Sequence, residues 1–270
     1  MEEIKNRIKL FLLNLFQPFG KISKVQRNIL LVFWVLFIFF IASLSKSQIF
    51  PSPTKILITF ITIIQEKDIW ENFMSSLMFI LKGISYALIL TMIICYSSRI
   101  PFFEPLSYII TKLRYLTFAG VVFLFTMISN TTSDLKTYLL LFGIVPYFTT
   151  SFLSILNGIS ESEINKNFVN RMNRWEALKE TVIVGKIDML LEVLRQNYAI
   201  AWMMITMVEA KAMNEGGIGT MLIKSDKYLG KLDLVFAILL FVLIVGIFFD
   251  WLIGWIRLTL FEYVSKMLNK

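Results

Sequence analysis

Long apolar runs without charge are the feature that most constrains the fold of this chain. The first of them, "ILLVFWVLFIFFIASLS", extends from Ile29 to Ser45 and holds no charged residue. A helix needs roughly 20 apolar residues to cross the hydrocarbon core of a bilayer. The runs do not alternate apolar and polar residues, as the short strands of a membrane β-barrel would. We therefore expect an all-α membrane protein.

Several more such runs follow along the chain, and we predict about six transmembrane helices by the same length criterion. Hydrophobic residues make up 57% of the chain and charged residues 17%, whereas soluble domains are about 45–50% apolar. The expected spans lie near Ile29–Ser45, Asn72–Tyr96, Pro105–Ser129, Leu135–Asn157, Asp188–Glu209 and Leu232–Trp255.

The composition also excludes several kinds of chemistry. The chain has no histidine and a single cysteine, Cys95, so it can form neither an internal disulfide nor a Cys/His zinc site. Nucleophiles activated by histidine are excluded for the same reason. We therefore predict no catalytic site, no metal site and no cofactor held by this chain. The net charge of +8 indicates a membrane surface rather than nucleic acid.

The amino-terminal segment, residues 1–27, has the pattern of an amphipathic helix. Its apolar residues share one helical face, and Pro18 and Gly20 end the pattern. Such a helix lies on membrane lipid or packs on the end of a helical bundle, and both readings stay open. The basic segment before the first span is too long for a cleaved signal peptide. The apolar face consists of Ile4, Ile8, Phe11, Leu12 and Leu15.

Lysine and arginine counts predict the orientation of the chain. With the amino terminus inside, the inner segments hold 15 of these residues and the outer segments hold 8. The bias favours both termini in the cytoplasm. The membrane domain then covers residues 28–257, with an inner loop at 158–187, an outer loop at 210–231 and a cytoplasmic tail at 258–270.

The inner loop is polar but carries apolar residues at helical spacing. A helical cytoplasmic loop of this kind offers a docking surface for a soluble partner, and the alternative is a solvated connector. A connector has no need of Trp175 or of the apolar stripe, which favours docking. The stripe consists of Ile164, Phe168, Met172, Trp175 and Leu178.

The fifth expected span carries polar residues at a spacing of seven. Asp188, Arg195, Trp202 and Glu209 form a nearly straight line down the helix, about 30 Å long at ~1.5 Å per residue. Ionisable groups at such depth are costly unless they face water or partners. The line therefore indicates either the lining of a hydrophilic path or a set of ion pairs, for instance of Glu192 with Arg195 or with Lys82.

The glycine-rich stretch "NEGGIGTMLIKS" (residues 214–225) resembles a nucleotide-binding loop only at first sight. A P-loop needs glycine directly before Lys-Ser, and here that residue is Ile223. A dinucleotide-binding loop needs a third glycine where this chain has Leu222. We therefore expect Gly217 and Gly219 to form an outer turn between the fifth and sixth spans.

These motifs, in this order, resemble the permease subunit of an ABC importer, closest to the nitrate/sulfonate/taurine group. The resemblance covers most of residues 50–257. Upstream of the fifth span it includes "FPSPTKIL", then Ser76, Leu77 and Gly83, and then Pro146. Further on, the matching residues are Trp175, Arg195, Trp202, Glu209, Gly217-Ile218-Gly219, Gly246, Asp250 and Arg257.

The resemblance implies a type I importer fold in a bacterial inner membrane. Two permease chains would enclose a pore, two separate ATPase subunits would bind and hydrolyse ATP, and an external solute-binding protein or lipoprotein would deliver the substrate. The ATPase would dock on Arg171, Asn173, Arg174 and Trp175. The translocation path would be lined by Arg195, Trp202, Glu209 and Asp250.

One part of the family pattern is absent. The family's docking loop carries E-A-A-x3-G, and in this chain those positions hold Asn165, Lys166, Asn167 and Arg171. Glycine permits a positive φ or a close approach of another backbone, and arginine permits the second poorly. Two alternatives therefore stay open, a membrane scaffold derived from a permease and an ion-coupled secondary transporter.

Overall fold

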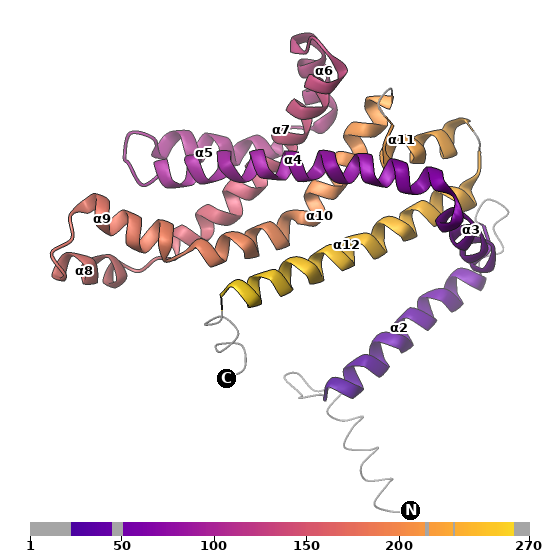
Figure 1. Cartoon of the computed structure of the whole chain (residues 1–270), viewed down its shortest axis with the longest axis horizontal. Coiled ribbons are helices and arrows are strands. Elements are labelled where there is room, and N and C mark those ends of the chain that lie inside the picture. Colours follow the sequence, from indigo (N-terminus) through magenta and orange to yellow (C-terminus); the bar gives the residue numbers. More distant parts are fainter. Residues whose placement is uncertain (1–22, 45–50, 214–215, 229, 262–270) are drawn as a thin grey trace, which may run out of the picture. The chain divides into compact units, whose positions relative to one another are not determined.

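A computed structural model describes residues 23–44, 51–213, 216–228 and 230–261 of the chain (Figure 1). Regular structure in these residues is helical throughout, and they contain no strand. The all-α prediction is confirmed to that extent. Residues 1–22 of the predicted amphipathic segment at 1–27 and most of the tail at 258–270 lie outside the described residues. The chain divides into two units, Met1–Ile58 and Thr59–Lys270.

The first unit contains α2, Lys24–Leu44, and the beginning of α3, Pro53–Gln65. Ser23 and Gln26 cap α2 reciprocally, since each side chain bonds the other's backbone N–H, at 3.3 and 2.9 Å. The helix α3 begins at a proline, whose fixed φ and missing N–H suit a first helical position.

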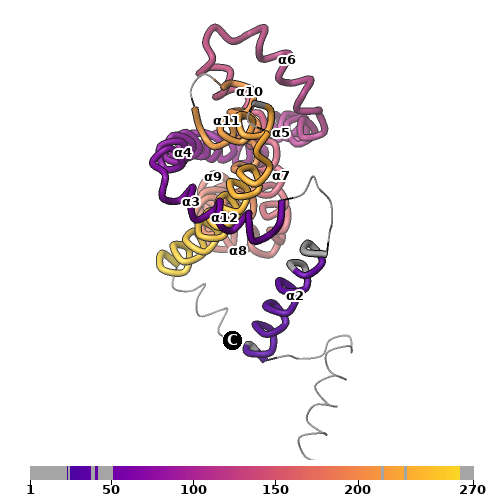
Figure 2. Tube along the Cα trace, turned by 90° about the vertical axis from the view of Figure 1, so that its right-hand side faces the viewer, coloured from indigo at the N-terminus to yellow at the C-terminus, as the bar shows by residue number. Residues whose placement is uncertain are grey.

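Four long helices run beside one another in the second unit (Figures 1 and 2). They are α4 (Lys67–Ser97), α7 (Thr132–Asn157), α10 (Ile187–Lys211) and α12 (Leu232–Leu260). Helix α7 packs between α4 and α10, and α10 packs in turn on α12. Each corresponds to one of the predicted apolar runs.

The core of this unit lies where α4, α7 and α10 meet. Its completely buried side chains include Ile80 of α4, Ile144 and Phe148 of α7 and Ile205 of α10. The outward faces of α4 and α12 expose large apolar side chains, for example Leu243. An exposed apolar face on a long helix is what a lipid environment accommodates.

Three helices, α4, α7 and α12, are long and apolar enough to cross a membrane. A fourth candidate consists of two helical segments, Glu104–Tyr115 and Phe118–Ile128, that are bent by 111° at their junction. The six predicted spans are therefore not established, because length and composition support three or four among the described residues.

The bend corrects the prediction of one continuous third span. Helix α5 (Glu104–Lys112) and a short 3-10 turn are followed by extended backbone at Leu116 and Thr117, before α6 (Phe118–Ile128) begins. Threonine is a common residue at the start of a helix, and here it precedes the apolar run of α6. With 11 residues, α6 is too short to cross a bilayer by itself.

Shorter helices make up the two connections that flank α10. Between α7 and α10 lie α8 (Glu161–Val169), α9 (Arg174–Leu178) and one π-helical segment, Lys179–Val184. Between α10 and α12 lie α11 (Ile218–Ile223) and a second π-helical segment, Lys224–Tyr228. The predicted inner loop is therefore helical, as two helices joined by a turn.

Candidate functional site

The loop between α7 and α10 is closed at its base by polar contacts. Helix α8 begins at Ser160, whose hydroxyl accepts a hydrogen bond from the backbone N–H of Glu163. The Glu163 carboxylate pairs with Lys186, at the other end of the loop, at 3.1 Å. Asn167 and Thr181, both buried, are joined by a hydrogen bond from α8 to the π-helical segment. The Glu163–Lys186 ion pair and the Asn167–Thr181 hydrogen bond therefore hold the loop together at two places.

The turn after α8 has an unusual residue for its geometry. The N–H of Met172 bonds the carbonyl of Asn167 at 3.1 Å, and that of Arg171 bonds the carbonyl of Phe168 at 3.0 Å. These two bonds define a Schellman motif, whose second residue past the helix is usually glycine. Arg171 has a φ of 61° there, and it alone has a positive φ among the described non-glycine residues.

Helix α9 starts at a complete capping box. The Asn173 side chain accepts from the N–H groups of Trp175 and Glu176, both at 2.9 Å, and Glu176 accepts from the N–H of Asn173 at 2.8 Å. Asn173 therefore fixes the start of the helix that carries Trp175. The Trp175 side chain is 67% exposed, and Val169 nearby in sequence is 82% exposed.

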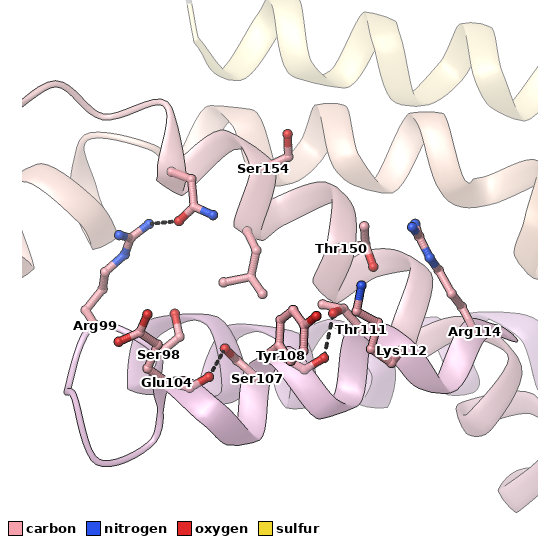
Figure 3. A pocket seen from close by; sticks show the side chains of 12 residues that line it. Ser98, Arg99, Glu104, Ser107, Tyr108, Thr111, Lys112, Arg114, Thr150 and Ser154 are labelled. Atoms are coloured by element: carbon pink, nitrogen blue, oxygen red, sulfur yellow. Dashed lines mark hydrogen bonds between the residues drawn. The ribbon is translucent and has the colours of Figure 1, made fainter.

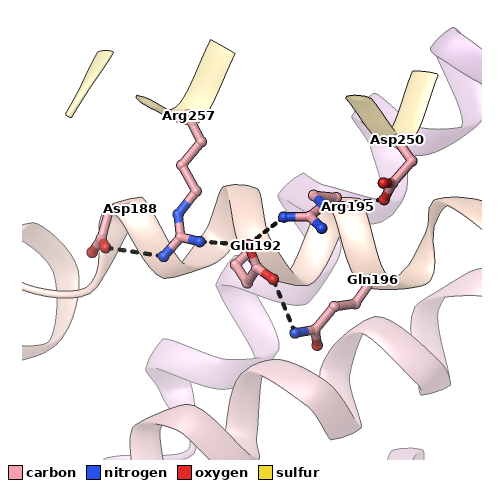
Figure 4. A network of polar contacts seen from close by, with 6 residues as sticks. All are labelled: Asp188, Glu192, Arg195, Gln196, Asp250 and Arg257. Carbon is pink, nitrogen blue, oxygen red and sulfur yellow. Dashed lines mark hydrogen bonds and ion pairs between the residues drawn. The ribbon is translucent and has the colours of Figure 1, made fainter. Parts of the chain in front are cut away.

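Ion pairs join the first half of α10 to α12 (Figure 4). Arg257 of α12 bonds Glu192 and lies 3.7 Å from Asp188. Arg195 lies 3.0 Å from Asp250 of α12 and 3.6 Å from Glu192. The expected pair of Glu192 with Arg195 is confirmed. Because these charges are paired, α10 can carry them on the face that packs against α12.

The middle of α10 is aromatic and buried. Trp202 is 5% exposed and stacks on Tyr198, whose ring also lies against Phe249 of α12. The ring of Phe73 of α4 lies 6.2 Å from that of Trp202, tilted by 56°. Within the part of the chain that the structure describes, the Trp202 indole N–H and the Tyr198 hydroxyl are buried without a hydrogen-bond partner.

The end of α10 holds a buried carboxylate. Glu209 is 1% exposed, and its oxygens accept hydrogen bonds from the Ser76 hydroxyl of α4 at 2.7 and 2.8 Å. The backbone N–H of Gly219 donates to the same carboxylate at 2.9 Å. The Ser76 oxygen in turn accepts from the N–H of Ile218 at 2.9 Å. Glu209 therefore ties the start of α11 to α4 and α10.

The glycines of the outer turn are required by this contact. A side chain at Gly217 would place its Cβ 2.3 Å from the Glu209 carboxyl carbon, and the Gly217 φ is 106°. A Cβ at Gly219 would lie 2.0 Å from the backbone oxygen of Thr206. The described part of the "NEGGIGTMLIKS" stretch, residues 216–225, thus forms a turn and the helix α11 that pack on α10, and the N–H groups of Gly217, Ile218 and Gly219 donate within the chain.

The structure brings together some of the predicted site residues and separates others. Arg195 and Asp250 form a pair, while Trp202 and Glu209 lie at successive levels of α10 and are buried. Lys82, the alternative partner of Glu192, is exposed and takes no part in the network of Figure 4. The role of these residues in a translocation path stays a prediction.

Sequence reasoning missed two central residues, Arg257 as an ion-pair partner and Ser76 as the partner of Glu209. A signal existed for the first, since Arg257 follows Asp250 by seven residues and so shares its face of α12. Comparison with known proteins adds no further residue: no family model matches the chain, and no curated protein matches it.

Proposed function

We propose that this chain is the transmembrane permease subunit of an ATP-driven ABC importer in a bacterial inner membrane. It would form part of the path of a small solute that an external binding protein delivers. The observation that carries the proposal is the conformation of Arg171, which adopts a positive φ at the position where the resembled family has glycine. The backbone conformation at this position thus supports the resemblance, although the residue is arginine where the family has glycine.

Exposed residues of the loop between α7 and α10 support docking of a soluble ATPase. Phe168, Val169 and Trp175 expose 44%, 82% and 67% of their surface on a loop that is otherwise polar. Exposed aromatic and apolar groups of this kind are typical anchors at protein interfaces. The cations Arg171 and Arg174 are exposed beside them and would meet acidic groups of the partner.

Rigid coupling is the mechanism we propose for this loop. The Glu163–Lys186 pair and the Asn167–Thr181 hydrogen bond hold α8 to the segment that leads into α10. A movement of the docked ATPase would therefore reach α10 as a rigid-body displacement. ATP would be bound by the partner, and this chain would need no cofactor of its own.

In this proposal α10 is one of six spans, together with α2, α4, the bent pair Glu104–Ile128, α7 and α12. At ~1.5 Å per residue, the 25 residues of α10 would measure about 37 Å, enough to cross a bilayer. Its charges are tolerated because Asp188, Glu192 and Arg195 are paired with α12. Both termini would then lie in the cytoplasm.

The path would run along α10 at the interface of two permease chains. Arg195 and Asp250 have side chains that are 39% and 55% exposed, which leaves their pair accessible to a second chain or to solute. The N–H of Trp202, which has no hydrogen-bond partner among the described residues, would supply a further polar contact when the path opens. Glu209 would hold the outer end of the path together with α11.

One observation favours a second candidate, a non-transporting scaffold derived from a permease. The family's signature positions are altered, and Asn167, one of them, has its side chain buried within the loop itself. A scaffold would keep a membrane partner but would not couple it to ATP turnover.

Co-purification with an ATPase subunit tests the proposal. Trp175→Ala and Arg174→Glu should release the ATPase in pull-downs, because both side chains are exposed on the loop. Trp251→Ala serves as the matched control, since Trp251 is 61% exposed on α12, away from the loop. Unchanged ATPase retention in both loop variants contradicts the docking surface. Solute uptake driven by a proton or sodium gradient through this chain alone contradicts the whole proposal.

Thiol labelling tests the path. Cysteines at positions 195 and 250, in a Cys95→Ser background, should react with water-soluble reagents in the resting state, whereas cysteines at 202 and 209 should react only during turnover. The difference follows from the exposure of the native side chains. Protection of all four positions in every state points to packing in place of a path.

A further inference from the structure

A polar cavity lies beside the ends of two long helices, away from the ion pairs of α10. It is bounded by α5, by the loop that follows α4 and by the last turns of α7 (Figure 3). Its volume is about 640 Å³, within the range of about 300–1,000 Å³ that is usual for small-molecule sites. Hydroxyl and amide groups line it, namely those of Ser98, Ser107, Thr111, Thr150, Ser154 and Asn157.

Three cations face the cavity, and neutral groups hold them in place. Arg99 donates to the side-chain oxygen of Asn157 at 3.0 Å. The ammonium of Lys112 lies 4.7 Å from the centre of the Tyr108 ring. Arg114 donates to the hydroxyl of the adjacent tyrosine at 3.0 Å. Among the described residues, none of the three forms an ion pair with a carboxylate.

Glu104 is the only acidic side chain among the described residues that line the cavity, so one carboxylate stands against three cations. Burial lowers the pKa of Arg99 against the opposing effects of Cys95 and Glu104, so its guanidinium is incompletely solvated. In the described part of the chain, the Nε–H of Arg99 is buried without an acceptor. Leaving a buried donor without a partner is unfavourable, and a bound anion would provide the missing acceptor.

The remaining charge can be estimated from the groups around the cavity. The carboxyl-terminal ends of α4 and α7 lie beside it, and each contributes about half a negative charge. Three cations, one carboxylate and these two helix ends leave about one positive charge. The cavity is thus suited to a monovalent anion with several oxygen acceptors, such as a phosphodiester.

Its depth fits the level of lipid headgroups. The candidate spans α4 and α7 end beside the cavity, at Ser97 and Asn157. Thr150, its lining residue deepest along α7, is seven residues from the end of that helix, about 10 Å at ~1.5 Å per residue. Basic pockets between transmembrane helices at this level bind anionic headgroups.

We propose that the cavity beside Arg99, Lys112 and Arg114 is a binding site for a singly charged phosphate group. The arginines would bond its oxygens, since guanidinium groups match phosphate geometry, and the surrounding hydroxyls would complete the shell. The group would come from an anionic phospholipid or from free phosphate. The proposal depends on the membrane setting of α4 and α7 and is independent of transport.

Hydrogen exchange of the purified full chain in a non-ionic detergent tests the proposed site. The amides of residues 98–115 are followed after addition of phosphatidylglycerol, phosphatidylcholine or inorganic phosphate at equal ionic strength. Slower exchange with phosphatidylglycerol alone supports the site and identifies a lipid headgroup. Slower exchange with inorganic phosphate as well supports the site and identifies phosphate itself. Equal exchange in all conditions overturns the proposal.

Variants of the lining residues test whether the change in amide exchange arises from binding at this cavity. Arg99→Gln with Arg114→Gln should weaken binding at least about tenfold, because each removes charge-assisted hydrogen bonds. The charge-conserving pair Arg99→Lys with Arg114→Lys should lose less binding than the glutamine pair, because it keeps both charges but not the guanidinium geometry, and measurable binding in it shows that the chain still folds. Lys67→Gln with Lys227→Gln is the matched control, since both lysines are exposed elsewhere. Unchanged binding in the glutamine variant also overturns the proposal.

Discussion

Replacing Arg171 with glycine should stabilise the loop that we assign to ATPase docking. Arg171 occupies the glycine position of a Schellman motif with a φ of 61°. The left-handed conformation costs a non-glycine residue roughly 1–2 kcal/mol, while glycine adds about 0.5–1 kcal/mol of backbone entropy to the unfolded segment. The net gain is therefore about 0.5–1 kcal/mol, or roughly a two- to fivefold smaller open population.

Hydrogen exchange of the amides of residues 161–172 in the full chain measures this gain directly. The Arg171→Gly variant should exchange two to five times more slowly there, because local opening of α8 breaks the two bonds of the motif. Arg171→Ala is the control, since it removes the charge but keeps the Cβ. Equal protection in both variants assigns the effect to charge, and faster exchange in the glycine variant refutes the strain argument.

Three further predictions concern thermal stability in detergent. Gly219→Ala should destabilise the protein by about 2 kcal/mol, because the added Cβ would lie 2.0 Å from a backbone oxygen. Gly246→Ala is the control and should be neutral or slightly stabilising, because nothing lies within 4 Å of its added Cβ. Equal effects of the two substitutions contradict the close approach at Gly219. Glu209→Ala should lower stability by about 3 kcal/mol, because it removes the acceptor of a buried hydroxyl and of a buried amide. An unchanged midpoint of thermal unfolding contradicts this structural role of Glu209. Arg257→Gln should destabilise by about 3 kcal/mol, because it leaves Asp188 without its cation and Glu192 with only the longer contact to Arg195. Asp250→Asn, in a more exposed pair, should change stability by less than about 1 kcal/mol, and the reverse order refutes this reading of the network.

The long helices were predictable because their apolar runs are determined locally. Helices α4, α7, α10 and α12 follow directly from runs long enough for a bilayer. The break between α5 and α6 was not predicted, because no proline or glycine stands at Leu116 and Thr117 to mark it. Helix α3 was also not predicted from the sequence.

The candidate site was predictable as a set of residues but not as a set of contacts. The spacing of seven on α10 selected Asp188, Arg195, Trp202 and Glu209, because residues on one helical face share an environment. Their partners come from elsewhere in the chain, and Ser76 lies 133 positions before Glu209. Such pairings depend on how helices pack, which the spacing on one helix does not contain.

Mass spectrometry of the gently extracted native complex tests the central proposal most directly. An importer permease predicts an assembly of two permease chains with two ATPase subunits, and Trp175→Ala, at a side chain that is 67% exposed, should reduce the ATPase content of that assembly. Recovery of this chain only by itself, or with membrane partners that include no ATPase, contradicts the proposal.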